Sequence, residues 1–531
     1  MARIGIALAM CLLAVTTFAQ EPTSRHQSNV PGGIYHEAIP AKSALPPSAW
    51  ASWSALKNWG GHFVRKGLPG DGLSLAIGLL TTSCLVIAGC RNRMKGVLLA
   101  ALLVGPAIPL TGLVPMQFFG NDLNRRAAFT LAFTSLYVAT AIWAIVGWLG
   151  ARRPEGTPWR PPIPESWAKM AAGVAVACAL TATAVRTPDD CGVYSNLGAQ
   201  RWIETGTLPY GDSALRGGAA ATYGPVLYGL HALAQLAVSG GATFPNAADA
   251  RPMDTSRYVR PDMGATKWVA ALSLIGVCVG LFIAARRMAD TATAWLMVTL
   301  FASSAYVLGL GGRDAAICGV GYVSHLTPAA FVALAMASLN RPWLAGMLMA
   351  LGAGTVYWPA FLVPLWIGHY FGRNRRAALS YVAGFAATGL VLAAWVILST
   401  KTAPGESAVG LFFRSTLEHQ EGMDQYGSSP FSFWGVHPDL ASSWHHPLFS
   451  FGGSLTKPTF LLVVITSVLG LWAGYRSRDG RLAALSAAMP CVVQLWKTHA
   501  GGSYVEWALP MLLLALLADR GDTRPDAITS P

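Results

Sequence analysis

The sequence predicts an all-α, polytopic membrane protein with about thirteen transmembrane helices after an N-terminal signal sequence. Of its 531 residues, 53% are hydrophobic and only 12% are charged, whereas a soluble domain carries about 25% charged residues. The apolar residues gather in runs close to the roughly 20 residues that a helix needs to cross a bilayer. Many of the 56 glycines and 33 prolines fall inside these runs, which membrane helices tolerate better than soluble helices do.

The net charge of +13 comes largely from arginines and lysines in short segments between apolar runs. This distribution is typical of cytoplasmic loops, which orient a membrane protein, and of contacts with phosphates or lipid headgroups. Nucleic-acid binding is not expected, because the basic residues follow this loop pattern.

The N-terminus predicts a signal peptide over residues 1–19, or a signal anchor if it is not cleaved. Arg3 is the charged start, Ile4 to Val15 form the apolar core, and Thr17-Phe18-Ala19 resembles a cleavage site between small residues. Residues 20–71 are then expected outside the cytoplasm, with part of this segment lying along the membrane as an interfacial helix.

The apolar runs set the remaining domain organisation. We expect additional N-terminal transmembrane helices over residues 72–164, a transmembrane core over 165–518 and a cytoplasmic tail over 519–531. The runs lie at residues 72–90, 96–116, 127–150, 167–186, 265–285, 290–311, 319–339, 343–371, 377–399, 459–475, 482–496 and 504–518. Residues 343–371 are expected to cross twice as a helical hairpin with its turn at residues 354–359, because basic residues flank both ends of that run.

Because successive spans cross the membrane in opposite directions, the short basic loops are expected in the cytoplasm, as the positive-inside rule requires. Arg125 and Arg126 are an exception to this rule, since they fall in an outer loop. The cytoplasmic basic residues are Arg91, Arg93, Lys95, Arg152, Arg153, Arg286, Arg287, Arg341, Arg373, Arg375, Arg376, Arg476 and Arg478. Residues 187–264, 312–318, 400–457 and 497–503 share the outer face and contain most of the reactive side chains. The site should therefore face the periplasm or the exterior of an inner-membrane protein.

Two adjacent carboxylates, Asp189 and Asp190, follow the apolar run that ends at residue 186. Burying them in lipid would cost several kcal/mol, but at the membrane face one of them could take a proton from a substrate hydroxyl. Asp190 is the candidate base and Asp189 the second choice. The alternative is that the pair caps a helix or marks the water boundary.

No Walker-type GxxxxGK[ST] run, which would indicate nucleotide binding, occurs in the chain. Because ATP and sugar nucleotides are cytosolic, a donor for chemistry on the outer face would have to be linked to a lipid. Lys497 and His499 lie at the outer end of a span, where a lipid phosphate would lie. Snorkelling of the lysine side chain to the membrane surface is the alternative. Weaker candidates for phosphate binding are Lys457, Arg414 and Arg313, and Arg313 with Asp314 could also be a plain loop ion pair.

Several motifs, in order along the chain, resemble those of the polyprenol-phosphate-mannose-dependent mannosyltransferases of the GT-C fold. The matching segments are Asp190-Cys191-Gly192-Val193-Tyr194, Gly206-Thr207-Leu208-Pro209-Tyr210-Gly211-Asp212, Thr222-Tyr223-Gly224-Pro225-Val226-Leu227-Tyr228, Gly312-Arg313-Asp314, residues 426–435, Lys497-Thr498-His499 and residues 504–510. The resemblance covers about residues 165–518. It departs from the family where three extra spans precede Asp190, and where Tyr223-Gly224-Pro225 stands in place of Tyr-Pro-Pro.

The resemblance implies transfer of a hexose, such as mannose, from a polyprenyl-phosphate donor to a lipid or glycan acceptor. Substrate contacts are expected from aromatic and polar residues of the outer segments, although aromatic residues are also common at membrane interfaces without any such role. These residues are Tyr194, Tyr210, Tyr223, Asp314, His419, Trp434, Tyr504 and Trp507.

No metal site or cofactor is assigned, but a divalent cation stays open because four histidines crowd one outer loop. They are His419, His437, His445 and His446, and hydrogen-bonded loop histidines are the more common case. Two non-enzymatic functions are the alternatives. The first is a transporter or lipid flippase, and the second is a noncatalytic subunit that uses its outer loops as a docking surface in an envelope assembly. A transporter should show inverted repeats and ionisable residues in mid-span, and neither is evident in the sequence.

Overall fold

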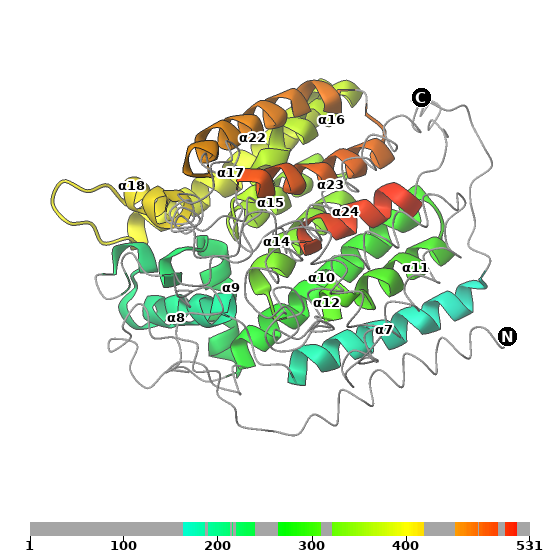
Figure 1. Cartoon of the computed structure of the whole chain (residues 1–531), viewed down its shortest axis with the longest axis horizontal. Helices are drawn as coiled ribbons and strands as arrows, with labels where there is room; N and C mark the ends of the chain where they lie inside the picture. Colours follow the sequence, from blue (N-terminus) through cyan, green and yellow to red (C-terminus); the bar gives the residue numbers. More distant parts are fainter. Residues whose placement is uncertain are drawn as a thin grey trace, which may run out of the picture.

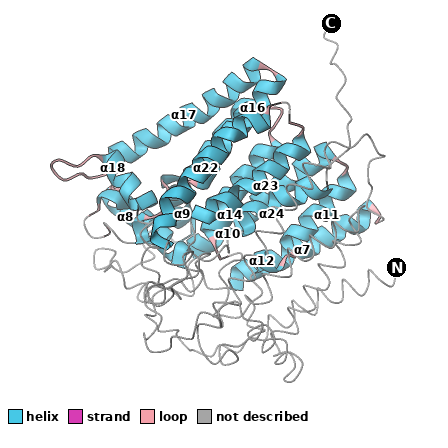
Figure 2. Cartoon of the chain, turned by 45° about the horizontal axis from the view of Figure 1, so that its top comes forward, coloured by secondary structure: helices cyan, strands magenta, loops and turns pink. Residues whose placement is uncertain are grey.

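A computed structural model of the chain describes residues 163–185, 190–212, 215, 219–238, 264–308, 321–418, 452–475, 477–496 and 505–517. These residues form helices joined by turns and short loops, and no strand occurs among them (Figure 2). The predicted signal sequence, interfacial segment, N-terminal spans and cytoplasmic tail lie outside the described residues.

The described helices follow one another with few long connections. The first group is α7 (Glu165–Val185), α8 (Asp190–Thr205), η3 (Pro209–Gly211), η4 (Ala219–Ala221), α9 (Pro225–Val238), α10 (Gly264–Met288), α11 (Thr291–Ala302), α12 (Ala305–Leu308) and α14 (Val323–Ala337). The second is α15 (Pro342–Ala353), η7 (Trp358–Leu362), α16 (Val363–Arg373), α17 (Arg375–Ser399), α18 (Ala408–Phe413), η8 (Arg414–Glu418), α22 (Gly452–Gly474), α23 (Asp479–Trp496) and α24 (Val505–Leu517).

The helices pack side by side around a core that is mostly aliphatic. They run from α7 and α11 on one side, through α10, α14 and α24, to α16 and α22 on the other (Figure 1). α8, α9 and α18 lie together at one end of this bundle (Figure 1). Close packing of α10 on α14 is possible because Gly280 has no side chain, since a Cβ there would lie 2.6 Å from the backbone of Ala333.

Within the described residues, three helices are long and apolar enough to cross a membrane. They span Glu165–Ala184, Gly264–Met288 and Arg375–Ser399, and the last two have 25 residues each. At 1.5 Å per residue such a helix is about 37 Å long, which exceeds a hydrocarbon core of about 30 Å. The predicted class, an all-helical membrane protein, agrees with these helices.

The run over residues 343–371 forms two helices separated by a turn, of 12 and 11 residues, and its double crossing of the membrane stays a prediction. α15 ends at Ala353, and Thr355 Oγ1 donates a hydrogen bond of 2.6 Å to the carbonyl of Gly352, which caps the end of the helix. The chain then passes through the 3₁₀ turn of η7 into α16. α15 packs on α17 and α16 packs on α22, so each arm has its own neighbour.

The predicted single run over residues 290–311 is instead broken after Ala302. The Ser303 hydroxyl donates to the carbonyl of Thr299 at 2.7 Å, and the Ser304 hydroxyl accepts from the Val307 amide at 3.2 Å. Serine side chains compete in this way with the helical hydrogen bonds. α12 therefore starts as a separate short helix.

The predicted outer loop over residues 187–264 contains two helices that the sequence pattern did not indicate. α8 buries the polar side chains Ser195, Asn196 and Gln200 together with apolar side chains such as those of Val193, Tyr194 and Leu197. Gln235 of α9 donates hydrogen bonds to both the carbonyl and the side-chain oxygen of Asn196. Because polar and apolar residues of α8 are buried together, hydrophobic periodicity could not reveal this helix.

The described basic residues predicted to be cytoplasmic gather at the end of the bundle opposite α8. The Arg287 guanidinium donates to the carbonyls of Met336 and Ala337, at 2.9 and 3.1 Å, and lies 3.7 Å from Asp479. Arg373 also pairs with Asp479. The ends of α10, α14 and α16 and the start of α23 therefore meet there, in agreement with the predicted alternation.

The predicted orientation can be tested by cysteine labelling. In a variant that lacks the eight native cysteines, Thr402→Cys should react with a membrane-impermeant maleimide in intact cells, because residue 402 is exposed and follows the outer end of α17. Arg341→Cys, at the basic end, should react only after the membrane is permeabilised. The reverse pattern would invert the whole scheme.

Candidate functional site at the α8 end of the bundle

Four helices start close together at the end of the bundle opposite the basic residues. The Thr266 hydroxyl, at the start of α10, donates to the carbonyl of Gly192 in α8 at 3.3 Å. The Trp507 indole, at the start of α24, donates to the carbonyl of Ser324 in α14 at 3.2 Å. We call this region the helix-start junction, and it consists of residues 190–192, 264–266, 322–325 and 506–507.

Asp190 is the first residue of α8 and thus belongs to the helix-start junction. Its neighbour Cys191 is buried in one apolar cluster with Ala265 of α10 and Val323 of α14. The start of α8 is therefore anchored against both helices. A carboxylate at this position also interacts favourably with the helix dipole. Asp189 lies outside the described residues.

A buried histidine–glutamate pair joins α14 to α24 within the junction. Nδ1 of His325 lies 3.3 Å from a carboxylate oxygen of Glu506, and the two side chains are 3% and 0% exposed. The rings of Tyr322 and Trp507 flank the imidazole, with centroids 4.9 and 6.1 Å away. The pair lies in a place shielded from bulk water.

The sequence reasoning did not select His325 and Glu506, although a signal for both was present. Each is an ionisable residue inside a predicted apolar run, 319–339 and 504–518 respectively. Ionisable residues within membrane segments are rare and mark functional positions. Only the fold shows that these two, 181 residues apart in the chain, are partners.

Tyr223 connects the junction with the other residues at this end of the bundle. Its ring packs against three buried clusters, which contain Tyr194, Cys191 and Tyr228 respectively. Its carbonyl accepts a hydrogen bond from the Tyr210 hydroxyl at 2.7 Å, and its amide donates to the Tyr228 hydroxyl at 3.2 Å. The structure thus brings together the predicted residues Tyr194, Tyr210 and Tyr223, with Tyr210 fully buried beneath the segment.

The turn after α8 is fixed by a glycine and an ion pair. Gly206 adopts φ = 68°, a left-handed conformation that favours glycine at the end of a helix. Arg201 Nε then donates to the Asp212 carboxylate at 2.6 Å across the turn. This hydrogen bond raises the pKa of Arg201 above its usual value. The pair holds Tyr210 in place between the two ends of the turn.

The glycine of Tyr223-Gly224-Pro225 is explained by a close backbone approach. The Gly224 amide donates to the carbonyl of Thr355 at 2.9 Å. A Cβ on residue 224 would lie 2.1 Å from the carbonyl oxygen of Gly354. A proline there would remove the hydrogen-bond donor and clash with the turn after α15. The departure from the Tyr-Pro-Pro pattern is therefore what lets α9 dock on this turn.

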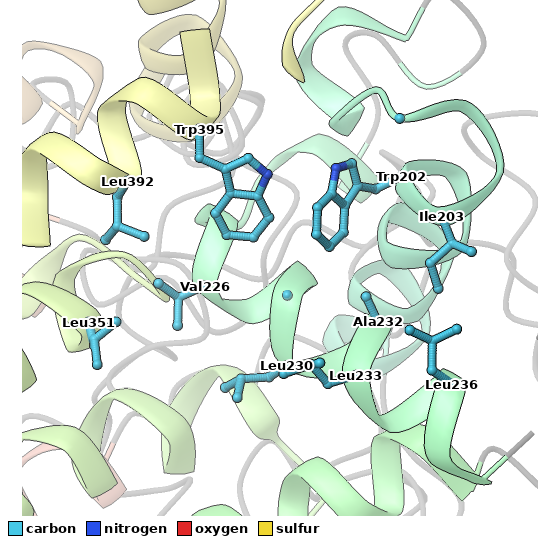
Figure 3. Close-up of a pocket in the computed structure, with 12 residues that line it drawn as sticks. Trp202, Ile203, Val226, Leu230, Ala232, Leu233, Leu236, Leu351, Leu392 and Trp395 are labelled. Atoms are coloured by element: carbon cyan, nitrogen blue, oxygen red, sulfur yellow. The ribbon is translucent and has the colours of Figure 1, made fainter. Parts of the chain in front are cut away.

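An apolar groove of about 670 Å³ lies between α8, α9, α15 and α17 (Figure 3). We call it the Trp202–Trp395 groove, after two indole rings whose centroids are 4.8 Å apart at one end of it. It is lined by Trp202, Ile203, Gly206, Val226, Gly229, Leu230, Ala232, Leu233, Leu236, Leu351, Leu392 and Trp395. Leu233 is 66% exposed, and only 11% of the candidate span in α17 is buried. In a bilayer this groove would open toward lipid.

Two predicted phosphate-binding residues lie elsewhere in the described structure. Arg414 begins η8 and is 63% exposed, 3.6 Å from Glu406, in a surface ion pair of a kind that contributes at most about 1 kcal/mol. Phe412, just before it, packs edge-on against Tyr210. Lys457 lies in α22, but its side chain is outside the described part.

The other predicted site residues lie outside the described residues: Asp189, Arg313, Asp314, His419, Trp434, Lys497, His499 and Tyr504. Their roles stay predictions. Among the described residues, no group of three or more His, Cys, Asp or Glu side chains is arranged to hold a metal ion. The loop histidines His419, His437, His445 and His446 are not part of that set.

Comparison with protein families, with curated proteins and with solved structures found no match for this chain.

Proposed function

We propose that the protein is a glycosyltransferase of GT-C-like architecture with about thirteen spans. It transfers a hexose, such as mannose, from a polyprenyl-phosphate donor to a lipid or glycan acceptor on the outer face of the inner membrane. The observation that carries this proposal is that Tyr223 packs against a buried cluster of the helix-start junction and against a second cluster that Trp202 and Trp395 of the apolar groove also contact. A reaction on a lipid-linked substrate needs a place for a hydrocarbon chain beside a polar centre.

The groove has the properties that a hydrocarbon chain requires. Its lining is aliphatic and aromatic, and each methylene buried there would contribute about 0.8 kcal/mol. The groove lies beside the outer end of α17. Gly206 lines the groove, and two residues later the amide of Leu208 donates to the carbonyl of Ser399, the last residue of α17, at 2.7 Å. A chain in the groove would hold its phosphate near the outer loops.

The polar centre would supply the proton chemistry of glycosyl transfer. Asp190 is the candidate base for the acceptor hydroxyl, and its position at the start of α8 puts it at the helix-start junction. Lys497 and His499 are the candidate cations for the departing phosphate, because they precede the start of α24. The mechanism assigns no cofactor.

The position of the buried ionisable pair favours an enzyme over a transporter. His325 is the third residue of α14, and Glu506 is the second residue of α24. The pair therefore lies at the end of the bundle, whereas transporters place coupling groups near the membrane midplane.

The direct test is a transfer assay with the purified protein in proteoliposomes. The donor is radiolabelled polyprenyl-phosphate mannose, and the acceptors come from a membrane lipid extract. We expect the label to appear in a new lipid or glycan product, with release of polyprenyl phosphate. Movement of the donor across the bilayer without any product would instead indicate a flippase.

Filling the groove should weaken use of the lipid donor. Gly229 lines the groove, and a Cβ there would already lie 2.9 Å from the tip of the Trp395 ring. Gly229→Leu should raise the KM for the polyprenyl-phosphate donor by about 10-fold, the equivalent of losing roughly two buried methylenes. Gly389→Leu on α17 is the matched control, because nothing lies within 4 Å of its Cβ position. An unchanged KM in Gly229→Leu would place the donor chain elsewhere.

A further inference from the structure

The basic end of the bundle carries more positive charge than its described acidic residues neutralise. Asp479 already pairs with both Arg287 and Arg373. Four further arginines at this end are exposed, and none of them forms an ion pair in the part of the chain that the structure describes: Arg286, Arg341, Arg375 and Arg376. Their charge can therefore be balanced by an anion from outside the protein.

Two of these arginines lie beside exposed aromatic rings. Arg375 is the first residue of α17, and its guanidinium carbon lies 5.8 Å from the centroid of the Phe371 ring, near the end of α16. The Phe371 ring in turn lies 6.2 Å from the ring of Tyr475, which directly follows α22. Phe371 is 46% exposed, and Trp472, three residues before Tyr475, is 79% exposed. We call Phe371, Arg375, Arg376, Trp472 and Tyr475 the Phe371–Arg375 site.

An exposed apolar surface continues from this site along the bundle. Leu379 lies one turn after Arg375 on the same face of α17 and is exposed. On α22, Val468 lies one turn before Trp472 and is exposed as well. Only 11% of the candidate span in α17 is buried, so in a bilayer this surface would contact acyl chains. The arginines and aromatic rings at its end would then lie at the level of the lipid headgroups, where such side chains are enriched.

We propose that the Phe371–Arg375 site binds the headgroup of an anionic phospholipid. The phosphate accepts hydrogen bonds from the Arg375 guanidinium, whose planar fork matches two phosphate oxygens, and Arg376 adds a second positive charge. The acyl chains lie against Leu379 and Val468. The continuous lipid-facing surface favours a lipid over a protein partner. This lipid is not the sugar donor, because Arg375 and Trp395 are about 30 Å apart along α17.

The test measures lipid binding to the full-length protein in detergent by native mass spectrometry, with phosphatidylglycerol as the probe and phosphatidylcholine as the neutral lipid. The wild type should bind phosphatidylglycerol more tightly. Arg375→Gln should weaken this binding by about fivefold and the double change with Arg376→Gln by about 25-fold, since one arginine near an anionic lipid contributes roughly a factor of five. Arg375→Lys should recover only part of the loss, because lysine keeps the charge without the planar fork.

Arg286→Gln is the matched control, because it removes the same charge from an exposed arginine near the end of α10. It should bind phosphatidylglycerol like the wild type, and a loss equal to that of Arg375→Gln would overturn the assigned site in favour of a general attraction by the charged end. Equal affinity of the wild type for both lipids, or displacement of the lipid by an equal concentration of inorganic phosphate, would overturn the proposal too. A change of oligomeric mass in Arg375→Gln with lipid binding intact would indicate a protein contact instead.

Discussion

Asp190→Asn is expected to lower sugar transfer by about 10²-fold or more, because it removes the base and keeps the size of the side chain. Expression and the oligomeric profile should be those of the wild type. Asp190 also begins α8, where loss of a negative charge costs about 0.3–1 kcal/mol of helix stability. That structural effect is too small to produce a 100-fold loss of rate, so the two roles are separable by measuring kcat and melting temperature on the same samples.

Asp189→Asn is the matched control for this prediction. It removes the adjacent carboxylate and should cost clearly less activity. Equal and mild losses in both variants, accompanied by equal drops in melting temperature, would show that the two aspartates only cap the start of α8. Such a result would leave the proposed reaction without its base.

Lys497→Met is expected to weaken binding of the polyprenyl-phosphate donor by about 10- to 100-fold. A charge-assisted contact with phosphate is worth roughly 1.5–3 kcal/mol, which corresponds to that change in affinity. Acceptor affinity should stay nearly unchanged, because the acceptor does not carry the phosphate. The measurement is equilibrium binding of a fluorescent polyprenyl-phosphate mannose to the protein in detergent.

Lys401→Met provides a matched loss of charge on the same side of the bundle, since Lys401 is exposed just beyond the end of α17. It should bind the donor like the wild type. Wild-type affinity in Lys497→Met, together with a silent His499→Ala, would make the turn before α24 a solvated membrane boundary and not the donor site.

The helical class and the main apolar helices could be predicted from the sequence because they depend on local composition. Runs such as residues 265–285 and 377–399 must satisfy their backbone groups internally in lipid, and they became α10 and α17. The hairpin at residues 343–371 followed from the basic residues at both ends of its run. By contrast, α8 was missed because it buries polar residues, such as Asn196 in its contact with Gln235, among its apolar ones.

Within the candidate site, the sequence by itself indicated candidate side chains and predicted that they share one end of the bundle. It selected Asp190, Tyr223 and Trp507 from their types and from their places beside apolar runs. Only the tertiary structure decided which residues are neighbours. His325 and Glu506 are 181 positions apart and touch because α14 packs on α24. The Trp202–Trp395 groove likewise exists because α8 and α9 dock on α17. Such contacts depend on long-range packing, which no local pattern encodes, because a helix with a given face can bury it against several alternative partners.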